Sequence, residues 1–445
     1  MSPLWSALLT WEGHCKLHLV FICIFSYLSR WGTRYDHGDS TVRRTLLHFA
    51  EDKLLCAESS RLQGITAAQK YAILSQRLAL DTNTTNYLFR PLDPYHAVRS
   101  MDEQIAKHMR VCMAVEDGIE TLCGVAPSEP ILSEAASRIM LTDRFSLLSA
   151  LSLVLSGYFI NRGDRGESVV ASFFTWARDQ VVKSIHNIDL HRRLCPYFTV
   201  TELFGHLFAE SEYKIMLDSQ PSLHHPDDRP QSFSTVFKDA MMHFNHFIKP
   251  QEQDVVALPY LLHFMARGAA ALGANRQLNF SAVYPFLYST TDLDVNKVGF
   301  IIVQVRNRST DSGSGSLDDT FSKMDSFNCE LITDIHKKDA RFPIPIIRIV
   351  FLLSGNGNSL KQHMYTPSQN CEKPCFTSYD YVCSGVNANI FLPTEEAPLK
   401  WQQMVEMVDK VDDWSSLYDV DEPNVLRSQL PGSAEHEGHF ASWLS

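Results

Sequence analysis

The sequence lacks the motifs of several widespread enzyme classes. It contains no Gly-x-x-x-x-Gly-Lys-Ser/Thr loop, no Gly-x-Gly-x-x-Gly between a predicted strand and a predicted helix, and no Gly-x-Ser-x-Gly. Each of these motifs supplies a backbone or nucleophile geometry that its chemistry requires. Nucleotide hydrolysis by a P-loop, dinucleotide chemistry and α/β-hydrolase catalysis therefore have no motif support here.

Cysteine is too sparse for a secreted disulfide scaffold, with ten cysteines in 445 residues and no short regular spacing. Cys371, Cys375 and Cys383 also lack the Cys-x-x-Cys spacing of a zinc ribbon. We interpret the cysteines as reduced thiols and expect an intracellular protein, cytoplasmic or nuclear.

No apolar run reaches the length of a membrane span. The longest candidate, residues 17–28, has twelve residues with Lys16 before it and Arg30 after it, whereas a spanning helix needs about 20. We therefore expect no stable membrane span. A signal sequence at residues 16–29, a buried element and a misannotated start remain open for the first 40 residues.

Basic residues are outnumbered, and the formal net charge of −11 argues against a general polyanion binder. A weak, local nucleic-acid contact stays possible, and the partner is otherwise unknown. The acidity is concentrated at the C-terminus, where the chain from Thr394 onward has eleven acidic and three basic residues.

The hydrophobic pattern changes along the chain. Apolar residues at three- and four-residue spacing predict helices from about residue 41 to 182, including residues 101–122, and helices again across most of 199–265. We divide the chain into an apolar N-terminal segment (1–40), a helical region (41–160), a core with a helical insertion at about 199–265 (161–390), and an acidic tail (391–445). One amphipathic helix is expected at residues 401–411.

Residues 267–307 predict three strands, because apolar and β-branched residues cluster between turn signals. Residues 344–353 predict a further buried strand. The expected fold is α/β, with a helical N-terminal half packed on a small mixed sheet of about four to five strands.

Two polar features accompany this sheet. Gln304 and Arg306 end the last of the three strands and project from one face, since side chains two apart in a strand point the same way. Glu167 begins a helical row that continues through Val170 and Phe174 to Ala177 and Val181. A capping box formed by Asp164 and Glu167 explains the same residues without any site.

This pattern resembles a large, expanded family of uncharacterised fungal proteins with a PD-(D/E)XK restriction-endonuclease-like core. The resemblance is carried by short matches scattered between about residues 43 and 353 and by the strand that ends at Pro285: HMR (108–110), SEP (128–130), RGDRGE (162–167), RGAA (267–270) and QVRN (304–307).

The resemblance implies a metal-binding Asp on the middle strand and a Lys on the last strand that activates water. Here these positions hold Ser281 and Arg306, and with Gln304 also uncharged Glu167 is the only carboxylate left in the set. Serine and glutamine are poor ligands for a hard cation, and arginine stays protonated near neutral pH. We therefore expect a degenerate, non-catalytic site formed by Glu167, Gln304 and Arg306, with Glu167 a weak candidate metal ligand and no cofactor.

Two other functions remain open. A working nuclease would need Mg2+ or Mn2+ held by Glu167 with Asp292 or Asp294. Alternatively, the protein is a structural or protein-interaction module in which the acidic tail is the binding segment.

Two weaker sites complete the expectations. Arg267, Arg306 and Arg308 are cationic candidates for residual phosphate binding. His243 and His246, expected on one helix (MMHFNHF), can form a metal site with His263 or simply be core histidines.

Overall fold

The computed structural model describes seventeen segments of the chain between residues 40 and 412. These are residues 40–59, 63–80, 82–83, 102–116, 121–128, 130–157, 162–185, 197–250, 256–274, 279–288, 294–306, 317–327, 329–332, 341–353, 359–364, 375–394 and 397–412. The apolar run at 17–28 and most of the acidic tail lie outside them. Within these segments no helix is long and apolar enough to cross a membrane.

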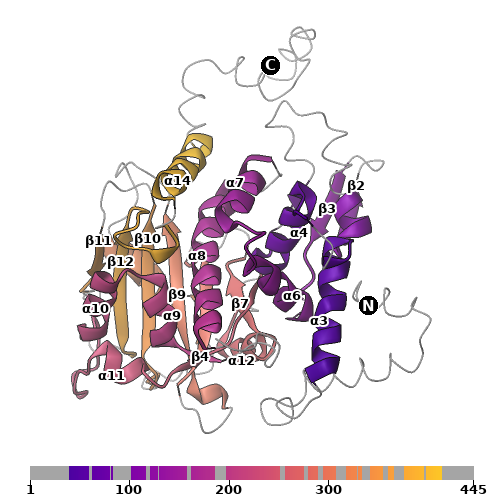
Figure 1. Ribbon diagram of the computed structural model, residues 1–445. Helices are drawn as coiled ribbons and strands as arrows, with labels where there is room; N and C mark the ends of the chain where they lie inside the picture. The colour runs from indigo at the N-terminus through magenta and orange to yellow at the C-terminus, as the bar shows by residue number, and fades with distance from the viewer. Residues whose placement is uncertain are drawn as a thin grey trace, which may run out of the picture.

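A mixed sheet of nine strands occupies the left half of the molecule in Figure 1. Its main path runs β11-β12-β10-β9-β8-β5-β4, while β7 pairs with β8 and β6 pairs with β7. β9, β10 and β12 are parallel, whereas β7, β8 and β9 form an antiparallel meander. The strands are β4 (Phe198–Thr199), β5 (Met241–Met242), β6 (His246–Ile248), β7 (Ala269–Leu272), β8 (Ala282–Leu287), β9 (Val298–Arg306), β10 (Ile346–Leu352), β11 (Ser359–Gln362) and β12 (Ser378–Ser384).

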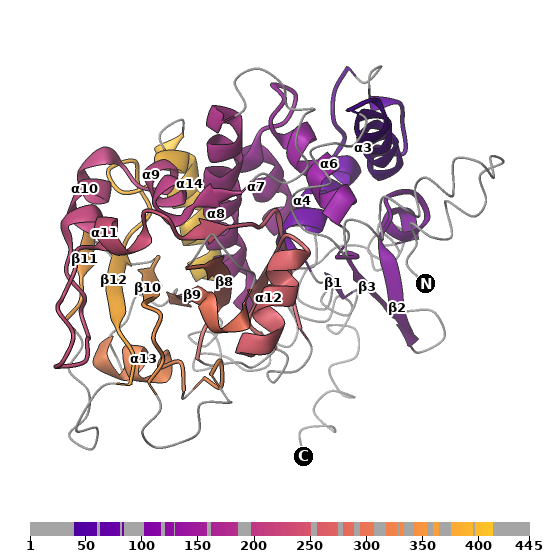
Figure 2. The same cartoon turned by 90° about the horizontal axis from the view of Figure 1, so that it is seen from below.

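Helices cover both faces of this sheet (Figure 2). Phe174 of α8 stacks on Tyr284 of β8 at 4.3 Å between ring centroids, and Phe237 of α11 packs on Tyr379 of β12. These helices therefore share one face, and α13 lies on the other, where the Phe321 ring contacts Arg348 of β10. The helices of this region are α8 (Arg162–Ile185), α9 (Val200–Leu207), α10 (Glu210–Asp218), α11 (Phe233–Phe237), α12 (Leu258–Ala266), α13 (Leu317–Lys323) and α14 (Pro398–Asp412).

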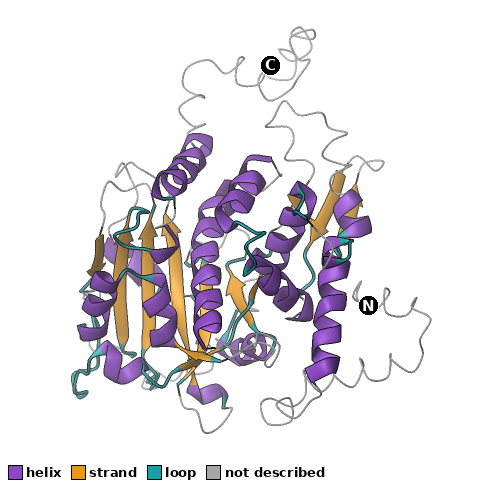
Figure 3. Ribbon diagram, viewed as in Figure 1, coloured by secondary structure: helices purple, strands orange, loops and turns teal. Residues whose placement is uncertain are grey.

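The N-terminal elements pack beside the β6–β7 edge of the sheet (Figure 3). α4 begins at a capping box in which the Thr66 hydroxyl accepts from the Gln69 N–H and the Gln69 side chain accepts from the Thr66 N–H. One hydrophobic core runs from Leu54 in α3 to Val405 in α14, so the helical region and the sheet share it. These elements are α3 (Ser40–Leu55), α4 (Ala67–Leu78), α6 (Pro130–Met140), α7 (Leu147–Gly157) and a small sheet of β1 (Thr82–Asn83), β2 (Val111–Glu116) and β3 (Thr121–Val125).

The meander in residues 267–307, the strand near 344–353 and the tail helix confirm three sequence predictions. The expected strand number is wrong, because short strands inside 199–265 and two strands after β10 enlarge the sheet to nine. Residues 101–122 and MMHFNHF were expected to be wholly helical, but both contain strands. In both places pairing with another strand outweighs a local helical pattern.

The face of the sheet that carries α13 contains a fully buried ion pair. Arg348 donates to both carboxylate oxygens of Asp380 on the neighbouring strand, at 2.8 and 2.6 Å. Both side chains are 0% exposed. Arg348 also donates to the Phe321 carbonyl and the Ser378 hydroxyl, so its charge is matched by several acceptors.

Breaking this pair from one side should strongly destabilise the fold. We expect Asp380→Ala to lower the free energy of unfolding by about 3–5 kcal/mol, because it leaves the Arg348 charge buried without its partner. Chemical denaturation measures the loss. The double variant Arg348→Met/Asp380→Leu should recover most of it, and Glu210→Ala, which breaks the exposed Glu210–Lys214 pair, should change little. An Asp380→Ala protein as stable as the Glu210→Ala protein would contradict this account.

Candidate functional site

Ser281, at the expected aspartate position, is a structural hydroxyl in this fold. The β8–β9 register pairs Ala282 with Val303, so Ser281 lies opposite Gln304. Its backbone N–H donates to the Val303 carbonyl at 2.7 Å, and its Oγ accepts from the Val305 N–H at 3.1 Å. Ser281 is 2% exposed. Its hydroxyl therefore ties β8 to the end of β9.

Gln304 and Arg306 lie on the face of the sheet that α8 does not cover. Phe174 of α8 contacts Tyr284 and Phe351, whose register partners in β9 are Ile301 and Val305. Side chains alternate along a strand, so Gln304 and Arg306 point to the opposite face. Both are half-buried. Gln304 Oε1 is buried and has no hydrogen-bond partner among the described residues.

Glu167 lies half-buried near the start of α8. The row that follows it is buried as expected, since Val170, Phe174, Ala177 and Val181 are at most 2% exposed. Because α8 covers the other face of the sheet, the register does not bring Glu167 together with Gln304 and Arg306 on one face.

Of the two aspartates considered as a second metal ligand, Asp292 and Asp294, the structure describes Asp294. Asp294 accepts hydrogen bonds from the backbone and side-chain nitrogens of Asn296, both at 2.9 Å, which is a local turn. Asp292 and Arg308 fall outside the described residues. Across the segments that the structure covers, no group of three His, Cys, Asp or Glu side chains is placed to hold a metal ion.

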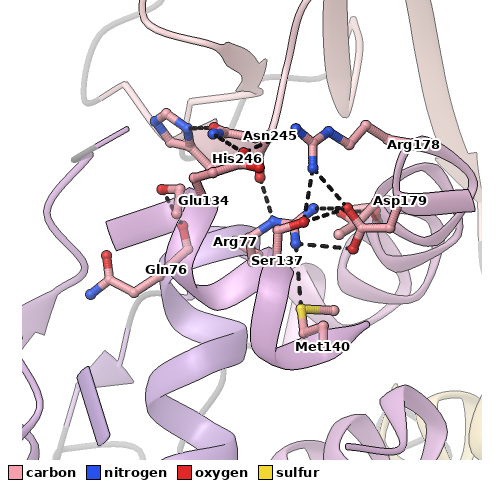
Figure 4. Close-up of polar contacts among 12 residues, drawn as sticks. Gln76, Arg77, Glu134, Ser137, Met140, Arg178, Asp179, Asn245 and His246 are labelled. Atoms are coloured by element: carbon pink, nitrogen blue, oxygen red, sulfur yellow. Dashed lines mark hydrogen bonds and ion pairs between the residues drawn. The ribbon is translucent and has the colours of Figure 1, made fainter. Parts of the chain in front are cut away.

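A second polar assembly lies buried where α4, α6 and α8 meet (Figure 4). Asp179 of α8 is its centre, and its carboxylate accepts from Arg77 Nη1 at 3.1 Å and Nη2 at 2.9 Å. The same carboxylate accepts from the Ser137 hydroxyl at 2.9 Å and from Arg178 at 3.0 Å. Both arginines are 0% exposed. These bonds join three helices through one carboxylate.

The assembly continues into the sheet. Arg178 donates to Glu134 Oε2 at 3.0 Å, and that oxygen also accepts from Asn245 Nδ2 at 3.2 Å. Arg77 Nε donates to the Asn245 carbonyl. We call Arg77, Glu134, Ser137, Arg178, Asp179 and Asn245 the charged junction. Its two arginines face two carboxylates, so the buried charges balance.

His246 extends the charged junction toward the surface. Its Nδ1 donates to Asn245 Oδ1 at 2.6 Å, and the Ser128 hydroxyl donates to its Nε2 at 2.7 Å. Arg267 donates to the Ser128 carbonyl. The SEP and RGAA matches, far apart in the sequence, therefore meet at this point.

The order Ser128–His246–Asn245 is that of a nucleophile, a base and an orienting residue. The electrostatics do not suit that chemistry. Burial first, and then the charges of Arg267 and Arg77, lower the pKa of His246 to about 3. A general base works best with a pKa near the operating pH. His246 stays neutral in the folded protein, and the arrangement favours a structural link.

Gly268 allows this link to form. Its φ is +66°, and its carbonyl accepts from the Asn245 N–H at 2.7 Å and the His246 N–H at 3.3 Å. A Cβ there would lie 3.2 Å from His243 Cε1 and 3.3 Å from Asn245 Oδ1. The site therefore requires glycine in two ways, for conformation and for space.

His243, His246 and His263 do not form the expected group. The MMHFNHF stretch is not a helix, and His243 lies between β5 and β6. His243 Nδ1 donates to the Met265 carbonyl at 2.9 Å, and burial lowers the pKa of this histidine to about 4. His263 is exposed on α12. Two of the three histidines therefore belong to the core.

Sequence reasoning missed the charged junction. One signal was present, because Arg178 and Asp179 interrupt a helix whose row of Phe174, Ala177 and Val181 is apolar. Charges beside a buried row imply buried partners. The partners themselves come from α4, α6 and the β6 region, and no spacing in the sequence points to them.

One comparison with known proteins gives a match. A family model described as a domain of unknown function (DUF8736) matches residues 91–187. No curated protein and no solved structure matches this chain. The matched stretch includes α6, α7 and α8 and supplies Glu134, Ser137, Arg178 and Asp179 to the charged junction.

Replacing Gly268 should disturb the junction. We expect Gly268→Ala to lower the free energy of unfolding by about 1–2 kcal/mol or more, from the left-handed backbone and the crowding against His243. Gly64→Ala is the matched control, because a Cβ at Gly64 meets nothing within 4 Å. Equal stability of the two variants in urea titrations would show that Gly268 is not required.

The buried histidines should make stability fall in acid. The unfolded chain binds a proton at His246 near the ordinary pKa of 6.5, whereas the folded chain resists it down to about pH 3. Stability is therefore retained above pH 6.5 and falls below it, by about 1.4 kcal/mol per pH unit for each such histidine. Urea unfolding between pH 7 and pH 4.5 measures this slope.

The variant His246→Gln should reduce the slope of unfolding free energy against pH by about 1.4 kcal/mol per pH unit, because glutamine does not titrate and one proton fewer is taken up on unfolding. His263→Gln is the control, because His263 is exposed. If His246→Gln keeps the full slope of the unmodified protein, His246 is not the group that opposes protonation.

Proposed function

We propose that this protein is a nuclease-like scaffold that does not hydrolyse phosphodiester bonds and acts instead by binding. The observation that carries the proposal is the role of Ser281. Where the resemblance implies a metal-binding aspartate, this chain has a buried hydroxyl that accepts from the Val305 N–H. That hydroxyl serves the sheet and supplies no charge for a hard cation.

The order of elements supports the nuclease-like part of the proposal. α8, which carries Glu167, precedes the β8–β9 pair, and β9 ends in Gln304 and Arg306. This is the helix and strand–turn–strand order that the resemblance implies. Ser281, at the position of the implied metal-binding aspartate, lies opposite Gln304 across the pair.

The geometry supports the non-catalytic part. Glu167 belongs to the helix that covers one face of the sheet, while Gln304 and Arg306 point to the other. An arginine side chain has only N–H donors and no acceptor, so Arg306 offers no base to activate water. Asp294 is used by the turn at Asn296. Arg267, one of the three cations considered for phosphate, donates to the Ser128 carbonyl.

The proposal predicts no metal-dependent cleavage. Purified full-length protein, incubated with supercoiled plasmid, single-stranded DNA or RNA and with Mg2+ or Mn2+, should leave these substrates intact on gels. The unmodified protein and Glu167→Ala should be indistinguishable, because Ser281 and Gln304 are poor ligands for a hard cation.

Cleavage that needs Mg2+ or Mn2+ and disappears in Glu167→Ala would overturn the proposal. Asp292→Asn and Asp294→Asn then identify which aspartate completes the site. Thermal unfolding of each variant, compared with that of the unmodified protein, separates a lost activity from a lost fold.

A further inference from the structure

A cleft of about 470 Å³ lies at the end of the sheet where β10 and β12 begin, beside α11. This is the lower end of the sheet in Figure 1. Its walls come from the loop between α10 and α11, from the residue after β8, and from the chain entering β10 and β12. The volume falls within the range of small-molecule sites, roughly 300–1,000 Å³.

The loop that forms one wall is held in place by hydrogen bonds to β12. The Ser222 N–H donates to the Ser378 carbonyl, and the Ser378 N–H donates to the Leu223 carbonyl, both at 2.8 Å. The Tyr379 hydroxyl donates to the Gln231 carbonyl at 2.7 Å. The cleft is therefore preformed, which lowers the entropic cost of binding.

The charges of the lining favour an anion. Arg229 and Arg341 both line the cleft, and His224 adds an imidazole. Arg341 forms an ion pair with Asp228, the single acidic residue of the lining, which holds its guanidinium at the mouth. Arg229 is exposed and makes no ion pair within the described residues. Arginine matches phosphate geometry through paired N–H donors.

The same cleft presents flat apolar surfaces. The Tyr288 side chain is 37% exposed and lines the cleft, and Pro230 and Pro343 contribute rigid ring faces. An aromatic ring stacks favourably on such surfaces, and base–aromatic stacking is worth a severalfold to hundredfold gain in affinity.

We infer that this cleft binds a small aromatic phosphate of about the size of a nucleoside monophosphate. The phosphate lies against Arg229 and Arg341, and the ring stacks on Tyr288. With Asp228 counted, the two arginines leave the lining with a net charge of +1, which is the sign that attracts a phosphate.

The cleft is remote from the Gln304 and Arg306 end of the sheet. The Tyr288 N–H donates to the Lys297 carbonyl at the start of β9, and Arg306 ends that nine-residue strand. At about 3.3 Å per residue the two ends lie roughly 25–30 Å apart. The inference therefore stands or falls independently of the proposed function.

Isothermal titration calorimetry on the full chain tests this inference, with adenosine 5′-monophosphate as the main probe. Adenosine and inorganic phosphate are its two fragments, and phenyl phosphate carries a ring without a sugar. We expect the monophosphate to bind more tightly than either fragment. If phenyl phosphate also binds, the site accepts aromatic phosphates in general. If phenyl phosphate does not bind, the site is specific for nucleotides. Either outcome supports the inference.

Two variants locate the binding. Arg229→Gln should weaken the monophosphate roughly tenfold or more, through loss of a charge-assisted hydrogen bond. Tyr288→Leu should weaken it roughly fivefold or more, through loss of stacking. Arg144→Gln removes an exposed arginine that does not line the cleft and should leave the affinity unchanged. Because the Arg229 and Tyr288 side chains are at the surface, the thermal unfolding of these two variants should match that of the unmodified protein.

Three results would each overturn the inference. The first is that adenosine 5′-monophosphate fails to bind at millimolar concentration. The second is that inorganic phosphate binds as tightly as the monophosphate. The third is that Arg229→Gln and Tyr288→Leu bind the monophosphate with the same affinity as Arg144→Gln.

Discussion

The carboxylate of Asp179 is the group on which the arrangement of this molecule depends. It accepts from Arg77 of α4, from Ser137 of α6 and from its own neighbour Arg178, and all of these groups are buried. A charge taken out of water is costly unless its partners are all in place. The helices therefore have one relative position in which Asp179 is satisfied, and that position sets where the helical region meets the sheet.

The sheet has a matching constraint on its other side. Arg348 and Asp380 pair across β10 and β12 beneath α13, both fully buried. Apolar residues supply most of the stabilisation in this core, but they tolerate sliding and repacking. Buried ion pairs have narrow geometric requirements, so in this protein they specify how the helices are placed relative to one another and to the sheet. Phe174 and its apolar neighbours supply the buried apolar surface.

The polar groups around the β8–β9 pair also serve structure. Ser281 connects two strands, and the cations and carboxylate considered for catalysis lie on different faces or bond elsewhere. The cleft beside Tyr288 differs in one respect, because Arg229 lines it without an ion pair to a described residue, whereas Arg341 is paired with Asp228. Within the described residues, the fold thus combines polar groups that serve structure with the concave surface beside Tyr288.

The sequence by itself determined the elements with strong local signals. The meander, β10, the buried row of α8 and the tail helix follow from apolar spacing, which local sterics and burial translate directly into structure. Tertiary structure decided the rest. The short strands β5 and β6 exist only because β8 and β7 offer partners. Packing between segments far apart in the chain places Gln304 on the face of the sheet opposite the helix of Glu167. The same kind of packing brings Ser128 to His246. No local pattern encodes such contacts.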